Sequence, residues 1–151
     1  MRLSKTCLGI VVAFCAPLAL AQTSVGKLLD SGAVKLSAED FKQQIVGRFL
    51  VGPGRGGNTA VTTAQEVVYL EGGSIRGSGS VASLGVGGYS FNIEGTWTID
   101  DRDRICQTTQ SGNVVLAPRC QYWFKLGDKY YFADSDTDRS ALVTIRTVKK
   151  I

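Results

Sequence analysis

The sequence predicts an exported all-β domain: a small antiparallel up-and-down barrel, or a strongly curved meander, of about eight strands with one short N-terminal helix. Residues 89–100 alternate apolar and polar side chains without a break, which is the pattern of a strand with one buried face. Shorter segments of the same kind recur along the chain between glycine- and aspartate-rich turns. The chain also begins with the pattern of a secretion signal.

Residues 1–21 are predicted to be a signal peptide that is not part of the fold. Arg2 and Lys5 precede an apolar run over 8–20, and Ala19–Ala21 forms an A-x-A cleavage motif. We therefore expect cleavage near Ala21 and a periplasmic or secreted protein. Lipidation at Cys15 is the alternative, although the residue before it is larger than lipoprotein signal peptidases prefer. No second long apolar run follows, so no transmembrane segment is expected.

The composition excludes several classes of function. The chain has 17 basic and 13 acidic residues, and loss of Arg2 and Lys5 leaves 15 basic residues, a net charge of +2. These charges are scattered rather than clustered, so a nucleic-acid partner is not expected. The chain contains no histidine, which removes Ser-His and Cys-His catalysis and most zinc sites. We therefore predict a non-enzymatic protein without a cofactor.

Two cysteines remain after signal cleavage. In an oxidising compartment, Cys106 and Cys120 are expected to form a disulfide. The closed loop of about 14 residues would stabilise the fold by ~3 kcal/mol.

The N-terminal part of the mature chain is predicted to contain a tether over 22–35, followed by a single domain over 36–151. A helix over 37–46 begins that domain, with Ser37 as its N-cap. Phe41 and Ile45 lie one turn apart on the same face. Because so short a helix is unstable alone, we expect it to dock on the sheet.

The strand prediction rests on β-branched and aromatic runs between turn residues. The predicted strands are 48–51, 65–70, 74–82, 89–100, 104–109, 119–126, 129–133 and 141–148. The apolar segment Val114–Leu116 is a candidate for additional pairing. Glycines make the strand over 74–82 thin, which should leave space beside the large side chains of 89–100.

The glycine-rich segment 52–59 resembles two nucleotide-binding motifs but is predicted to be a loop. Asn58 stands where a P-loop requires lysine. The residues that follow are β-branched, whereas both motifs require a helix there.

The aromatic side chains are expected to form core and barrel wall, and some could line a ligand pocket. On 119–126, alternation suggests that Tyr122 and Phe124 face inward and Trp123 faces outward. On the last strand, Val143 and Ile145 are expected inward. The candidate ligand-binding residues are Tyr89, Phe91, Trp97, Tyr122 and Phe124. Trp123 and Tyr131 are candidates for an exposed partner-binding patch.

Two acidic clusters are candidates for chemistry. Asp134, Asp136 and Asp138 match the start of a calcium loop, but Arg139 replaces the required glycine, so we expect a polar turn and no metal. The acids of the turn 100–103 could in principle supply a hydrolase carboxylate pair. Their neighbouring arginines favour solvated, self-paired acids instead.

Two resemblances are carried by short motifs. The Gly95-Thr96-Trp97 element resembles the G-x-W motif of calycin-type barrels such as lipocalins and avidins. Together with the Lys35–Glu39 helix start, Cys106 and Arg119-Cys120, it is similar to a family of small exported bacterial β-domains of uncharacterised function. The first resemblance implies a barrel architecture, and the second implies export but supplies no catalytic residues.

The leading hypothesis is therefore an exported, non-enzymatic binding domain of the cell envelope that takes a small apolar ligand in a barrel pocket. The alternative is an inhibitor-like envelope module that binds another protein through an exposed aromatic patch. A carboxylate-based hydrolase is the third class.

Overall fold

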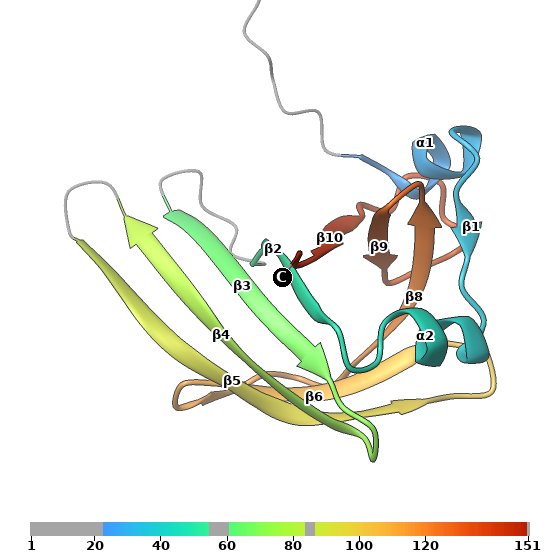
Figure 1. Ribbon diagram of the computed structural model, residues 1–151. Helices are drawn as coiled ribbons and strands as arrows, with labels where there is room; N and C mark the ends of the chain where they lie inside the picture. The colour runs from blue at the N-terminus through green and yellow to red at the C-terminus, as the bar shows by residue number, and fades with distance from the viewer. Residues whose placement is uncertain (1–22, 55–60, 84–86, 151) are drawn as a thin grey trace, which may run out of the picture.

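The chain folds into a closed, eight-stranded antiparallel barrel, which confirms the predicted fold class (Figure 1). A computed structural model describes residues 23–54, 61–83 and 87–150. The predicted signal peptide, its cleavage site and Cys15 lie outside the described residues, as does most of the 52–59 loop. The barrel strands are β2 (Phe49–Pro53), β3 (Val61–Tyr69), β4 (Ser74–Ser83), β5 (Gly87–Ile99), β6 (Ile105–Ser111), β8 (Arg119–Leu126), β9 (Lys129–Ala133) and β10 (Thr144–Val148).

The barrel is an up-and-down meander in which neighbours along the chain pair. Pairing of β10 with β2 and of β6 with β8 closes the ring. Two further strands extend it: β1 (Val34–Lys35) pairs with β8, and β7 (Val114–Val115) pairs with β6. The pairing of Val114–Val115 is the additional contact that the sequence suggested. Closure satisfies strand edges that would otherwise be open to another chain.

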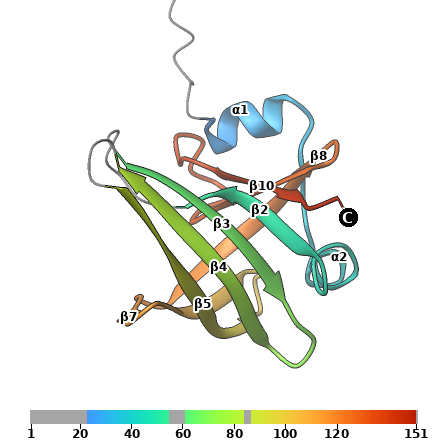
Figure 2. The same ribbon diagram turned by 60° about the vertical axis from the view of Figure 1, so that its left-hand side comes forward.

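The longest wall of the barrel consists of β3, β4 and β5 (Figure 2). Gly79 of β4 lies directly opposite Phe91 of β5, and a Cβ atom at Gly79 would overlap the Phe91 ring. The thin strand therefore gives space to a large side chain on its neighbour, as the sequence predicts.

Helix α2 (Ala38–Gln44) covers one end of the barrel. Its N-terminus has a capping box, in which the Ser37 hydroxyl accepts from the Asp40 N–H and the Asp40 carboxylate accepts from the Ser37 N–H. The Phe41 ring enters the barrel and packs on the rings of Tyr69, Trp97 and Trp123, with centroid distances of 5.3, 5.5 and 5.2 Å. Docking on this aromatic cluster stabilises a helix that is too short to form alone.

A second helix, α1 (Val25–Asp30), lies where the sequence analysis placed a tether, so that prediction is wrong for this segment. Ser24 caps it, and its buried residues Val25 and Leu28 pack on Phe124 and Ala133, on the outer face of the barrel. With only six residues, α1 has too little periodic pattern to be recognised, and its stability comes from packing.

The cover provided by α1 explains why the faces of β8 were assigned wrongly. Trp123 points into the barrel and is 2% exposed, whereas Phe124 points outward and is still only 1% exposed. Apolar alternation indicates which face is inward only when the other face is wet, and here both faces are buried. The same error affects Val143, which immediately precedes β10 and packs in the outer cluster beneath α1.

None of the helices in the described segments has the length and apolar character needed to cross a membrane.

Phe41→Ala should reduce the free energy of unfolding by about 3–5 kcal/mol, because it removes a buried ring and leaves a cavity among three aromatic neighbours. Urea denaturation measures this change. Lys42→Ala, at an exposed position on the same helix, should change stability by less than about 0.5 kcal/mol. Equal stabilities of Phe41→Ala and Lys42→Ala would show that the helix does not support the barrel.

Candidate ligand-binding cavity

A cavity of about 120 Å³ lies inside the barrel, next to the aromatic cluster. Tyr69 links the two, because its ring packs on Phe41 and also lines the cavity. The apolar side chains of the wall include Val67, Ile75, Ile93 and Phe132. These side chains come from four different strands, so closing the barrel is what brings them together.

The wall of the cavity reaches the protein surface at the connection between β7 and β8. Leu116 and Ala117 of this connection line the cavity, together with Ser111 and Arg119. Leu116 is 44% exposed, and Ala117 and Arg119 are also exposed. A molecule could therefore reach the interior past these residues.

The most unusual residue of the wall is Arg146, which is only 5% exposed. Its Nη1 donates to the carbonyl oxygens of Pro53 at 2.6 Å and Ile145 at 3.0 Å, and its Nη2 donates to Gln65 Oε1 at 3.1 Å. The guanidinium also lies 5.1 Å from the centre of the Phe132 ring. These contacts hold the charged group in one position.

The sequence prediction missed Arg146 because it placed the apolar residues Val143 and Ile145 inward. Side chains alternate along a strand, so Arg146 was expected to point outward. A signal was present on the adjacent strand, where Gly52 lies beside Arg146. A Cβ atom at Gly52 would lie 2.8 Å from Arg146 Nη1. A glycine beside a long side chain can indicate that this side chain crosses the neighbouring backbone.

Tyr69 and Gln107 form a polar pair in the wall. The Tyr69 hydroxyl donates to Gln107 Oε1 at 2.7 Å. Burial strongly raises the pKa of Tyr69, and the nearby positive charge of Arg146 offsets only part of this effect. The hydroxyl therefore stays neutral and remains a hydrogen-bond donor.

A third polar group joins the cavity wall to its opening. Gln121 is 3% exposed, and its Nε2 donates to Asp134 Oδ1 at 3.0 Å. The other oxygen of Asp134 accepts from Arg119 Nη2 at 3.3 Å. Asp134 thus connects an interior glutamine with an arginine at the opening.

The predicted pocket residues are distributed over several environments. Trp97 is buried in the aromatic cluster, and its Nε1 donates to the Leu70 carbonyl oxygen at 3.1 Å. Phe91 packs over Gly79 at the edge of the core, and Tyr89 is 66% exposed. The expectation that Tyr122 and Phe124 line the interior is wrong, because both pack in the outer cluster beneath α1.

The predicted partner-binding patch of Trp123 and Tyr131 does not exist at the surface. Trp123 belongs to the barrel core, while Tyr131 is half-buried in the outer cluster. The two rings therefore lie on opposite faces of the sheet. The reason is again that α1 covers the outside of β8 and β9.

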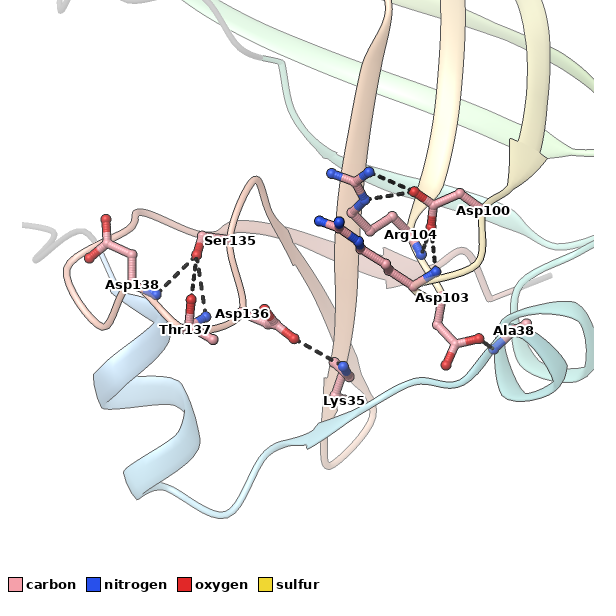
Figure 3. A network of polar contacts seen from close by, with 10 residues as sticks. Lys35, Ala38, Asp100, Asp103, Arg104, Ser135, Asp136, Thr137 and Asp138 are labelled. Atoms are coloured by element: carbon pink, nitrogen blue, oxygen red, sulfur yellow. Dashed lines mark hydrogen bonds and ion pairs between the residues drawn. The ribbon is translucent and has the colours of Figure 1, made fainter.

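The three acids of the candidate metal loop bind different partners, and Figure 3 shows one of them, the pair of Asp136 with Lys35. Asp134 binds Arg119 and Gln121, Asp136 pairs with Lys35 Nζ at 2.9 Å, and Asp138 accepts from Ser140. The Ser135 hydroxyl accepts from the backbone N–H groups of residues 137 and 138, which forms a polar turn. This arrangement does not bring the three carboxylates together as calcium ligands.

The acids of the 100–103 turn also have structural roles (Figure 3). Asp100 Oδ1 accepts from the backbone N–H groups of Arg102 and Arg104, and its Oδ2 accepts from Arg104 Nε at 2.7 Å. Asp103 has a φ of 59° and accepts from the Ala38 N–H at the start of α2. The turn thus anchors α2. Asp100 and Asp103 serve as hydrogen-bond acceptors within the fold, which differs from a glycosidase, where two carboxylates face each other across a cleft.

The predicted disulfide is confirmed. Cys106 and Cys120 are directly opposite each other on β6 and β8 and are covalently joined where the barrel closes. Their sulfur atoms lie near an Asp100 oxygen. These three residues form the one cluster of potential metal ligands in the described segments. Because metals bind thiolates and both sulfurs are in the disulfide, this cluster is not a metal site.

Compared with protein-family models, with curated proteins and with solved structures, the chain shows no significant match. The resemblances to calycin-type barrels and to small exported bacterial domains therefore remain predictions. The geometry of the cavity carries the functional argument.

Asp100→Asn should lower the stability of the protein at neutral pH but not in acid. Burial raises the pKa of Asp100, but hydrogen bonds and the positive charge of Arg104 outweigh it, so the pKa lies below its ordinary value of 3.8. The stabilisation is therefore present above pH 3.8 and is lost as the pH falls through the folded-state pKa. Urea midpoints of variant and parent, measured from pH 7 downward, should converge at the acid end.

The matched control is Asp101→Asn, which alters the exposed neighbour in the same turn and should leave the midpoint nearly unchanged. A gap between Asp100→Asn and the parent that widens on acidification would contradict the assignment of Asp100 as a stabilising carboxylate.

Proposed function

We propose that this protein is an exported, non-enzymatic binding domain of the cell envelope that holds a small, partly apolar molecule in its barrel. The observation that carries this proposal is the cavity between the strands, with its opening at the β7–β8 connection. Ligand sites are typically concave and mostly apolar, with a few polar groups that fix orientation. The wall described above combines branched aliphatic and aromatic side chains with polar ones such as Arg146 and Gln107.

The size of the cavity indicates how a ligand would be held. An apolar protein cavity of about 150 Å³ can bind benzene, so a space of about 120 Å³ encloses only a small group. The rest of the ligand would lie at the opening. Leu116 lines that opening, and Val114 lies on the same face, because it pairs with the cavity-lining Ser111. Both are exposed apolar side chains, at 44% and 60%.

The disulfide supports the exported location, because such bonds persist in oxidising compartments. The absence of histidine and the structural bonds of Asp100 and Asp103 support a binding role over a hydrolase. The alternative of a partner-binding aromatic patch loses its support, because Trp123 lies in the core. The cavity leaves ligand binding as the proposed activity.

Ligand binding can be tested with a panel that pairs alkanes, alcohols, primary amides and carboxylates of the same carbon skeleton. Trp97 and Trp123 contact the cavity-lining Tyr69, so their fluorescence should report binding. We expect at least one class to give a saturable change. A flat response to every class, confirmed by calorimetry, would refute the proposal.

Ala117→Phe should weaken binding of that class by about tenfold or more, because the added ring takes space that the bound ligand would occupy at the opening. Ala82→Phe is the matched control, since Ala82 is exposed and alternates with the inward-facing Val81 and Gly79 of β4. Calorimetric dissociation constants that are equal for the two variants would show that the ligand does not occupy this opening.

A further inference from the structure

We propose that the ligand is a small organic acid, whose carboxylate binds Arg146 and whose apolar body lies along the cavity towards Leu116. This inference rests on the proposed function and specifies its ligand class. It is carried by the chemistry of the cavity wall, in which a buried guanidinium stands beside branched aliphatic side chains.

Arg146 brings a fixed positive charge to the wall. Its bonds to the Pro53 and Ile145 carbonyl oxygens and to Gln65 set the plane of the guanidinium before any ligand arrives. A planar guanidinium matches the geometry of a carboxylate, and a preorganised one loses little entropy on binding. The guanidinium also lines the cavity, where this positioned charge can meet an anion.

A second group in the wall also favours an anion. Tyr69 donates to the oxygen of the Gln107 side chain, so Gln107 presents its amide NH₂ as a further hydrogen-bond donor. Gln107 lines the same cavity as Arg146. A carboxylate, which only accepts hydrogen bonds, matches donors of this kind better than an alcohol or an amine does.

A second arginine stands at the opening. Arg119 pairs with Asp134 at 3.3 Å, and both side chains are about half exposed, at 46% and 56%. An exposed pair of this kind is weak, so Arg119 can exchange partners with an incoming anion. The sequence-derived net charge of the mature chain is also positive, which favours the approach of an acid.

The apolar wall restricts the acid to one with a hydrocarbon body. A bare inorganic anion such as phosphate would not cover the apolar side chains of Val67, Ile75 and Ile93, which would stay in contact with water. The enclosed volume of about 120 Å³ takes a carboxylate with a few carbon atoms. A longer chain would continue past Leu116 onto the exposed apolar side chains of the opening, so short and medium alkanoates are the appropriate probes.

The first test uses the unmodified protein and compares n-alkanoates from butanoate to decanoate with the primary amides of the same chains. Calorimetry at neutral pH should show the acid binding about tenfold or more tighter than its amide, because only the acid carries the charge that Arg146 recognises. Affinity should rise with chain length and then level off. Equal affinities of acid and amide would overturn the carboxylate inference while leaving the barrel as a binding site. No binding of either series, together with a flat response to the wider panel, would refute the proposed function itself.

The second test removes the charge. Arg146→Gln should weaken alkanoate binding by about tenfold or more and leave amide binding within about twofold. Lys149→Gln is the charge-matched control, because Lys149 pairs with Glu66 and is exposed. Equal weakening by both variants would show that only overall charge matters and would overturn the role of Arg146.

A spectroscopic measurement keeps the inference testable if Arg146→Gln does not fold. In the unmodified protein, octanoate should shift the Arg146 Nε–H resonance saturably, with the same dissociation constant as in calorimetry. If octanoate shifts the resonances of Ile75 and Ile93 but not the Nε–H resonance of Arg146, the carboxylate binds elsewhere and the inference is overturned.

Discussion

The packing of Phe41 against Tyr69, Trp97 and Trp123 is the contact on which the rest of the structure depends. Four large rings from one helix and three strands meet at one end of the barrel. Burial of aromatic rings in edge-to-face contacts is among the larger stabilising terms available to a small domain. It fixes α2, and through the Asp103 bond to Ala38 it also fixes the turn between β5 and β6.

Because this cluster occupies one part of the interior, the remaining space lies where smaller and polar side chains face inward. Glycines accommodate large side chains around it: Gly79 makes room for Phe91, and Gly52 makes room for Arg146. Eight strands enclose an interior that side chains can fill or that can hold one small ligand. In this barrel the aromatic cluster fills one region, and a cavity lined by both polar and apolar side chains remains beside it.

The barrel itself could be predicted because its strands are short, amphipathic and joined by recognisable turns. The disulfide and the Ser37 cap could be predicted for equally local reasons. The face of β8 that points into the barrel could not be predicted, because α1 buries the opposite face, which alternation alone would leave exposed to water. Trp123 therefore points inward and Phe124 outward, the reverse of the prediction. Arg146 was missed since a charged residue on a strand normally faces water, and only its neighbour Gly52 indicated otherwise.

The central claim is that the barrel is filled beside α2 and hollow beside Arg146. A high-resolution crystal structure of the ligand-free protein tests it most directly. We predict an open space next to Ile75 and Ile93, with ordered water bound to Arg146 and Gln107, because polar cavities of this size retain water. Side chains that fill the space, leaving no room for one water molecule, would contradict the account.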